Sequence, residues 1–528
     1  MKTQYYRILM SLAVAVWLGF ALTGCRKDLG NYDYNPVDSL VIGNMQDTYQ
    51  YTIGATMNIS PELKFLHNST FNESDYTYEW ATYTSNTAAK KVIHQGKNLD
   101  IALPLGIGSY RGYYVVTQKS TGITWQKRFT LDVFGTFQPA GWFVLNDIDG
   151  KSRLDFYQEN RDAWNTFPVI YRDLASLIKD VNTGSPLELT GKPLSVTAFQ
   201  NRDGINSTMA YRLYINTDKA TQWINITAGF TWDKLRNVFA NETVSGEPAS
   251  VSVIYPGVAG GAYAYKDQQL YLYHTTYSLY GTPVNRISGV PGTFPISPYI
   301  VAPANQNMHA VFYDTQNKRF LGSMASSVGA TILNSSAQGL DLSNTGKDLV
   351  WMGYTPAFNG QVVALLKDGS RYYLARLTFP YTIPTTNINI LVSSFEEITG
   401  RLTDLATADK FTMDHQFGYL FYVSGNKLYQ YDMDSKMVKL AKDYGSRTIS
   451  LLKVNTLTAF TTANVPNFPA RFTSPGYGLI VGSYDAQNPA GSGTVDFYTA
   501  TSLMGNLAVS TPPFTGLGKV VDVKYSEL

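Results

Sequence analysis

Length, composition and charge already exclude several classes of protein. The chain has 528 residues, more than one ordinary domain holds, and its 44% hydrophobic content excludes a disordered chain. The net charge of +2, from 42 basic and 40 acidic residues, argues against a nucleic-acid-binding protein that relies on a basic face. A single cysteine excludes an internal disulfide and a cysteine-based zinc site. Aromatic residues make up 14% of the chain, and together with 43 glycines and 23 prolines they indicate strands and turns.

The N-terminus has the pattern of a secretory signal. A basic start precedes an apolar run from Ile8 to Leu22, which is shorter than the ~20 apolar residues that a membrane-spanning helix needs. The run ends in Leu22-Thr23-Gly24-Cys25, which resembles the bacterial lipobox, where the signal is cut before a cysteine that carries lipid. We therefore expect residues 1–24 to be a signal peptide and Cys25 to be lipidated. The alternative is a small-residue cleavage site that contains a cysteine by chance.

Residues 25–36 are expected to be the lipidated cysteine and a polar tether that lets a folded body stand off the membrane. The segment also resembles the charged signal that sends lipoproteins of the Bacteroidetes to the outer face of the outer membrane. That signal favours acidic residues, whereas this chain has Arg26 and Lys27 followed by a single Asp28. The expected location is the outer membrane, lipid-anchored and facing the cell exterior. No later stretch is apolar for long enough to suggest that the body crosses a membrane.

Residues 37–135 show regular strand signals. Residues 76–80 alternate apolar and polar side chains with period two, and the stretches 110–117 and 125–133 flank a turn at Ser120-Thr121-Gly122. About seven short strands without a helical period predict an immunoglobulin-like sandwich. Trp80, in a middle strand without partner cysteines, resembles the PKD-like variety of this fold. It is expected in the core, and the alternative is a platform for a ligand.

Residues 136–528 contain hairpins at a coarse interval, each an apolar strand, a polar turn and a second apolar strand. The clearest hairpins lie at 143–154, 265–273, 311–320, 363–374 and 420–431, and the last runs on into a second turn at 432–436. Such hairpins are typical of β-propeller blades, which take ~40–50 residues each. The length therefore predicts about seven blades, with eight as the alternative. The overall fold class is all-β, a sandwich followed by a propeller.

Two stretches break the strand pattern. Residues 171–181 and 231–239 place apolar side chains at helical spacing, so short helices on inter-strand loops are expected there. Loops on one face of a propeller often carry the binding surface.

No motif for catalysis or metal binding is present in the sequence. The five histidines, His67, His94, His274, His309 and His415, are isolated from one another. Asp147-Ile148-Asp149-Gly150 mimics half of a calcium loop but lacks the closing glutamate, so it is interpreted as a turn, as are Asp432 and Asp434. Carboxylate pairs that meet only in the fold remain open. No catalytic residue, metal ligand or cofactor is assigned.

The density of aromatic residues between 255 and 299 is the most suggestive feature. It comprises Tyr255, Tyr263, Tyr265, Tyr271, Tyr273, Tyr277, Tyr280 and Tyr299, with Trp351, Tyr354, Tyr372 and Tyr373 further on. Strand packing is the favoured interpretation, and platforms for sugar rings or peptide side chains are the alternative. The proline-rich stretches 289–298 and 464–469 are expected to be surface loops that either dock a partner or only connect blades.

Taken together, the Leu22–Cys25 ending, the segment Gly30-Asn31-Tyr32-Asp33-Tyr34, the sandwich and the aromatic propeller resemble the PKD-like family lipoproteins of the Bacteroidetes. The resemblance implies an accessory subunit of an importer with a SusC-like TonB-dependent barrel and a SusD-like lipoprotein. Such a subunit would capture oligopeptide or glycan, and no nucleic acid is expected as a partner. The family has no established catalytic residues to carry over. The second hypothesis is a surface hydrolase or lyase for polysaccharide or peptide, with its site on the propeller face.

Overall fold

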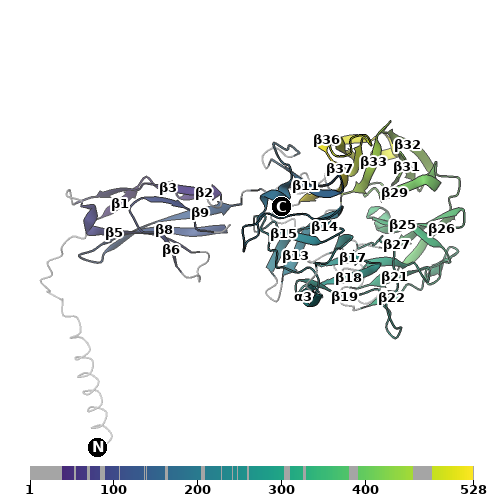
Figure 1. Cartoon of the computed structure of the whole chain (residues 1–528), viewed down its shortest axis with the longest axis horizontal. Helices are drawn as coiled ribbons and strands as arrows, with labels where there is room; N and C mark the ends of the chain where they lie inside the picture. The colour runs from purple at the N-terminus through teal and green to yellow at the C-terminus, as the bar shows by residue number, and fades with distance from the viewer. Residues whose placement is uncertain are drawn as a thin grey trace, which may run out of the picture. The chain divides into compact units, whose positions relative to one another are not determined.

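The protein is described by a computed structural model (Figure 1). It describes residues 39–526, apart from 53–54, 68–71, 84–89, 106–107, 136, 138, 161–164, 204–207, 228, 241, 246–247, 258–260, 303–309, 325–328, 380–389 and 456–477. The chain divides into two compact units, Met1–Val133 and Phe134–Leu528. Both are built of strands, as predicted, and no helix in the described part is long and apolar enough to cross a membrane.

The first unit is a β-sandwich. Its strands are β1 (Leu40–Gly43), β2 (Thr48–Thr52), β3 (Thr56–Ile59), β4 (Glu62–Phe65), β5 (Tyr76–Tyr83), β6 (Lys91–His94), β7 (Leu99–Ala102), β8 (Gly108–Gln118) and β9 (Thr124–Phe134), with a 3-10 turn η1 (Glu73–Asp75). One sheet has five strands in the order β2-β9-β8-β5-β6, and the pairs β1-β4 and β3-β7 form two smaller sheets. The described residues thus hold nine strands rather than about seven, because several four-residue strands carry too little pattern to be recognised.

Trp80 lies in the core of the sandwich, as expected. Its side chain is fully buried, and its indole Nε1 donates a hydrogen bond of 3.0 Å to the carbonyl oxygen of Gly96. Its ring centroid lies 4.4 Å from that of Tyr114 on the neighbouring strand β8. A buried indole needs a partner for its N–H, and Gly96 supplies it.

Among the described residues of the second unit, seven sheets of three or four antiparallel strands form the blades of a propeller, as the length predicted. Blade 1 contains β10 (Gly141–Ile148), β11 (Lys151–Gln158), β12 (Val169–Tyr171) and β37 (Lys519–Ser526); blade 2 contains β13 (Pro193–Asp203), β14 (Thr208–Thr217) and β15 (Thr221–Asn225); blade 3 contains β16 (Val253–Pro256), β17 (Ala262–Lys266), β18 (Gln269–His274) and β19 (Leu279–Pro283). Blade 4 contains β20 (Ala310–Asp314), β21 (Arg319–Ser323) and β22 (Ala330–Ile332), followed by the small pair β23 (Ser336–Ala337) and β24 (Leu340–Asp341).

Blades 5 to 7 each have four strands. Blade 5 contains β25 (Asp348–Thr355), β26 (Gln361–Asp368), β27 (Arg371–Thr378) and β28 (Leu391–Glu397); blade 6 contains β29 (Ala408–Met413), β30 (Leu420–Ser424), β31 (Lys427–Asp432) and β32 (Met437–Asp443); blade 7 contains β33 (Thr448–Val454), β34 (Leu479–Tyr484), β35 (Gly493–Thr499) and β36 (Ala508–Leu517). The short 3-10 turns are η2 (Ala357–Asn359), η3 (Leu405–Thr407) and η5 (Ser502–Met504).

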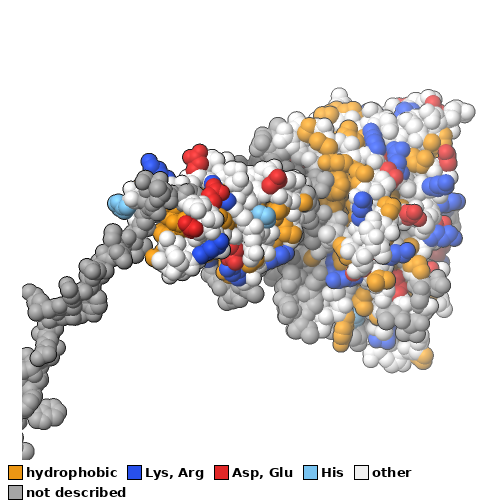
Figure 2. All heavy atoms as spheres, turned by 60° about the vertical axis from the view of Figure 1, so that its left-hand side comes forward, with side chains coloured by type: hydrophobic (Ala, Val, Ile, Leu, Met, Phe, Trp, Pro, Cys, Tyr) orange, Lys and Arg blue, Asp and Glu red, His pale blue; other side chains and the backbone are white. Residues whose placement is uncertain are grey.

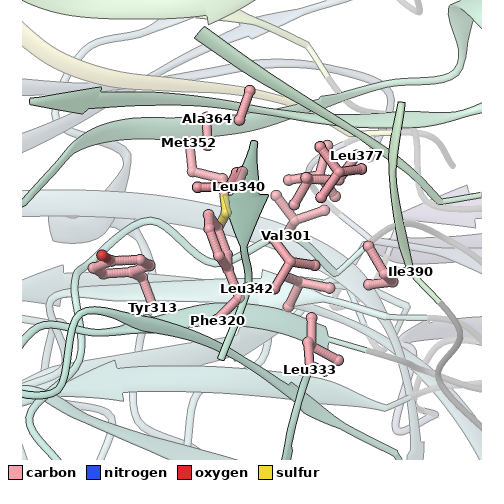
Figure 3. Packing of buried hydrophobic residues seen from close by; sticks show 14 of the residues in the cluster. Val301, Tyr313, Phe320, Leu333, Leu340, Leu342, Met352, Ala364, Leu377 and Ile390 are labelled. Carbon is pink, nitrogen blue, oxygen red and sulfur yellow. The ribbon is translucent and has the colours of Figure 1, made fainter. Parts of the chain in front are cut away.

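The core of the propeller consists of seven hydrophobic clusters, one between each pair of successive blades. Strand β10 shows why its sequence is a continuous apolar run: Phe143 packs toward blade 2, whereas Trp142 packs toward blade 7. Figure 3 shows the cluster between blades 4 and 5, where Tyr313 and Phe320 meet Met352. The seventh cluster, between blades 7 and 1, closes the ring.

The C-terminal strand completes the closure of the ring. The C-terminal strand β37 pairs with β10 in blade 1 and also contacts β13 of blade 2 and β33 of blade 7. Closure of the ring gives blade 1 a neighbour on each face, so that both faces of its sheet are buried.

All five predicted hairpins are present, as the central hairpins of blades 1, 3, 4, 5 and 6. In the first hairpin, Asp149 and Gly150 have φ of 52° and 81°, which the tight turn requires. The predicted helix at 171–181 is a single turn, α2 (Leu174–Leu177). The predicted helix at 231–239 is wrong: the nearest helix is α3 (Glu242–Ser245).

The backbone before α3 is not helical because its apolar side chains do not share one side. Leu235 is 79% exposed, whereas Val238 and Phe239 are buried between blades 2 and 3. Phe239 forms a parallel bridge with Tyr280, so its backbone groups bond across to blade 3 instead of along a helix.

Candidate ligand-binding face of the sandwich

The outer face of the five-stranded sheet is shaped by the alternation of side chains along β8. Tyr110, Gly112, Tyr114 and Val116 point into the sandwich and are buried, so the residues between them point outward. Strand β8 lies between β5 and β9, and side chains from all three strands therefore meet on this outer face.

A cavity of about 360 Å³ opens on this face. Its lining consists of Ala81, Tyr83, Lys90, Arg111, Tyr113, Val115, Gln126 and Arg128. The two smallest side chains, Ala81 and Val115, leave room between the longer ones. Binding sites for small molecules occupy roughly 300–1,000 Å³, so this cavity is at the lower end of that range.

Two tyrosines define the shape of the cavity. The rings of Tyr83 and Tyr113 lie 5.3 Å apart at an angle of 81° and present two nearly perpendicular planes. The guanidinium of Arg128 lies over the ring of Tyr113 at 5.6 Å, within the range of a cation–π contact. This contact uses the face of the guanidinium, and no hydrogen bond joins its N–H groups to a described residue.

The cavity is positively charged. Its described lining residues include Lys90, Arg111 and Arg128 and no carboxylate. Glu79, beside the cavity, forms an ion pair with Lys90 and offsets the charge of that lysine. Among the described residues, the lining contains no imidazole or thiol, the groups that most often titrate near neutral pH.

The aromatic residues singled out in the sequence lie mostly elsewhere and mostly in the core. Tyr263, Tyr273 and Tyr280 are buried between blades, whereas Tyr277 is 75% exposed. In the 289–298 stretch, which connects blades 3 and 4, Ile296 is buried. The residues of the cavity were not predicted. The stretches 110–117 and 125–133 were predicted to flank a turn, but the pattern within one strand does not show which outward side chains of neighbouring strands meet.

The acidic residues that the sequence analysis interpreted as turn residues do lie in turns. Asp147 caps the β10–β11 turn by accepting a hydrogen bond of 2.8 Å from the N–H of Gly150, and Asp432 accepts one of 3.0 Å from Asp434 in the β31–β32 turn. Cys25, His309 and the stretch 464–469 lie outside the described residues. Within those residues, no group of three or more His, Cys, Asp or Glu side chains could hold a metal ion.

On the propeller, Asp414 and His415 have shifted pKa values. Burial raises the pKa of Asp414 and lowers the pKa of His415 to about 4. The carboxylate of Asp414 accepts the backbone N–H groups of Gln416 and Phe417, so it caps the turn between β29 and β30. Asp414 thus serves the local turn, and the shifted pKa values of both residues follow mainly from burial.

Charged side chains of both signs are interspersed on the faces visible in Figure 2. This distribution agrees with the near-zero net charge and shows no extended basic stripe on that side of the molecule.

Comparison with known proteins supports the fold assignment of the N-terminal part. The PKD-like family matches residues 25–195, which is about a third of the chain. No curated protein matches the sequence significantly. The matched range covers the whole described sandwich and continues into the first strands of the propeller.

Comparison with solved structures gives matches of low identity and low TM-score. A quinonprotein alcohol dehydrogenase-like protein from Bacteroides thetaiotaomicron is 11% identical, with 93% of this chain and 99% of that chain covered and a TM-score of 0.39. The extracellular domain of a one-component system from the same organism is 11% identical over 62% of this chain and 35% of that chain, with a TM-score of 0.34. AztD from Citrobacter koseri is 12% identical over 85% of this chain and 96% of that chain, with a TM-score of 0.32. The chain is therefore an all-β protein whose N-terminal third matches the PKD-like family.

Proposed function

We propose that this protein is a lipid-anchored cell-surface subunit that binds ligand for a nutrient importer. The importer would consist of a SusC-like TonB-dependent barrel and a SusD-like lipoprotein, and the ligand would be an oligopeptide or a glycan. The observation that carries the proposal is the concave, aromatic and basic face of the sandwich, which offers ring faces and cationic groups to a ligand. The PKD-like match from residue 25 onward supports the same interpretation.

The anchor follows from the sequence around Cys25. Each acyl CH₂ that enters the bilayer contributes about 0.8 kcal/mol, so a cysteine with several acyl chains holds the protein firmly. The thirteen residues between Cys25 and the first described residue, Ser39, can span at most roughly 45 Å when fully extended. This length is sufficient for a folded body to reach partners beside it on the membrane.

Co-purification tests this proposal. The affinity-tagged full-length chain would be extracted from outer membranes in mild detergent, and its partners would be identified by mass spectrometry. The account predicts recovery of a TonB-dependent barrel and a SusD-like lipoprotein. The Cys25→Ser variant is the matched control, because it keeps the folded body but lacks the site of lipidation, and its recovery of the barrel should fall.

Turnover is measured on the same preparation. The protein would be incubated with peptide and polysaccharide mixtures, and new chain ends would be counted. The proposal predicts none. A protein that elutes alone and cleaves a polymer would instead be the surface hydrolase or lyase that the sequence left as an alternative.

A further inference from the structure

We infer that the cavity on the sandwich binds an acidic oligosaccharide, a sugar chain that carries carboxylate or sulfate groups. This inference rests on the proposed capture function and specifies its ligand class and its site. Arg128 and Arg111 would bind the acidic groups, while Tyr113 and Tyr83 would contact the sugar rings.

The positive charge of the cavity favours an anionic ligand. Glu79 offsets the charge of Lys90, so this expectation rests on Arg128. Among the described residues, Arg128 forms no ion pair, and its contact is the face of Tyr113. The planar guanidinium fork matches the two oxygens of a carboxylate or sulfate, and such charge-assisted hydrogen bonds are stronger than neutral ones. We therefore expect the ligand to carry an anionic group that pairs with Arg128.

The two tyrosine rings favour a sugar. Tyr83 and Tyr113 are both half-buried, so part of each ring faces the cavity. The apolar faces of sugar rings pack against aromatic rings, and the hydroxyls of sugars suit amide donors and acceptors. Gln126 supplies such an amide on the same face. Rings at a right angle, an amide and two cations thus complement a sugar that carries an acidic group.

The position of the cavity favours a sugar chain over a peptide. An extended peptide normally binds a sheet by adding a strand to a free edge, where backbone N–H and C=O groups are unpaired. The cavity lies over β8, whose backbone is paired with β5 on one side and β9 on the other. No backbone group at this position is left for a peptide main chain. Only side chains can recognise the ligand here, which favours a glycan.

Isothermal titration of the full-length, detergent-solubilised protein tests the inference. The probes are tetragalacturonate and a chondroitin sulfate tetrasaccharide, with maltotetraose as the neutral sugar and tetraglutamate as the acidic peptide. We expect at least one acidic sugar to bind and both controls to bind at least tenfold more weakly. Affinity should fall as sodium chloride is raised, because added salt screens exposed charges.

Variants locate the site. Arg128→Gln should weaken binding of the acidic sugar about tenfold or more, since it removes charge-assisted hydrogen bonds. Tyr113→Phe, which keeps the ring, should retain most of the affinity, whereas Tyr113→Ala should lose it. Lys64→Gln is the matched control, because Lys64 is an exposed cation on β4, outside the five-stranded sheet, and its loss should change affinity less than twofold. Thermal unfolding of each variant separates loss of binding from loss of fold.

The outcomes are distinct. Absence of binding to either acidic sugar would overturn the inference, as would equal affinity for maltotetraose, tighter binding of tetraglutamate, or a Lys64→Gln effect as large as that of Arg128→Gln. If the barrel still co-purifies in those cases, the proposed function survives without this ligand. If acidic sugar binds at Arg128 but no barrel co-purifies, the ligand site stands and the importer role fails.

Discussion

The carboxylate of Asp522 accepts a hydrogen bond of 2.9 Å from the backbone N–H of Val196, although 326 residues separate them. The same carboxylate accepts a bond of 2.6 Å from the ammonium of Lys453. Asp522 lies on β37 of blade 1, Val196 on β13 of blade 2 and Lys453 on β33 of blade 7. One side chain thus ties together three blades at the point where the C-terminal strand closes the ring.

Replacement of this carboxylate should therefore loosen the ring. We predict that Asp522→Asn lowers the free energy of unfolding by about 2–3 kcal/mol, because it leaves the ammonium of Lys453 partly buried without its counter-charge. The control is Asp348→Asn, which breaks the exposed ion pair with Lys318 and should cost less than about 1 kcal/mol. Urea denaturation measures both. Equal effects would show that Asp522 has no special part in closure.

The sandwich depends on Trp80. Trp80→Phe should destabilise the sandwich by about 1–2 kcal/mol, because it removes the hydrogen bond to Gly96 and leaves that carbonyl unpaired. Trp80→Ala should cost about 3–5 kcal/mol, since it also opens a cavity beside Tyr114. Differential scanning calorimetry should show a shift of one transition, that of the sandwich, whose core cluster is separate from those of the propeller. A substitution at Trp80 that leaves calorimetry unchanged would contradict this assignment.

The first propeller strand begins at a glycine that no other residue can replace easily. Gly141 has φ of 145°, and a Cβ there would lie 2.2 Å from the carbonyl oxygen of Tyr157. Gly141→Ala should cost roughly 3 kcal/mol, because a backbone oxygen cannot move aside as a side chain can.

Gly369 provides the matched control for this substitution. It also has a positive φ, 59°, but a Cβ there would have open space. Gly369→Ala should lower the free energy of unfolding by only about 1 kcal/mol, which is the cost of placing alanine at a positive φ. If chemical denaturation gave the same loss for both alanine variants, the close approach at Gly141 would not matter for stability.

The partly buried imidazole of His415 makes stability depend on pH. Its pKa of about 4 in the folded protein lies below the 6.5 of an exposed histidine, so the unfolded state binds the proton first. Above pH 6.5 the imidazole is neutral in both states and costs no stability. As the pH falls from 6.5 toward 4, protonation of the unfolded state lowers the free energy of unfolding by at most about 3 kcal/mol. His415→Gln should remove this part of the pH dependence between 6.5 and 4. An unchanged profile in this variant would show that His415 does not titrate as described.

Much of the fold could be predicted because the relevant patterns are local. The hairpins at 143–154 and 420–431 combine apolar strands with a turn residue at a fixed position, and chain length then sets the number of blades. The prediction of a helix at 231–239 was wrong because burial there depends on contacts with a distant part of the chain. Its spacing matches a helix, but Val238 and Phe239 are buried by contacts with blade 3, which no local pattern reveals.

The candidate site could not be predicted because it is assembled across strands. Tyr83 and Tyr113 are thirty positions apart in sequence and become neighbours only through the antiparallel register of β5 and β8, in which Tyr83 pairs with Arg111. Arg128 reaches the same spot because it pairs directly with Tyr113 across β8 and β9. Register of this kind is set by the buried faces of all three strands together.

The central claim is that Cys25 anchors a recognition protein at the cell surface, and metabolic labelling tests it most directly. Cells that express the full chain would be grown with radioactive palmitate, and the protein would be recovered by its tag. We predict label in the native chain and none in Cys25→Ser, which should also leave the membrane fraction. A native chain that accumulates at normal levels without label would contradict the account.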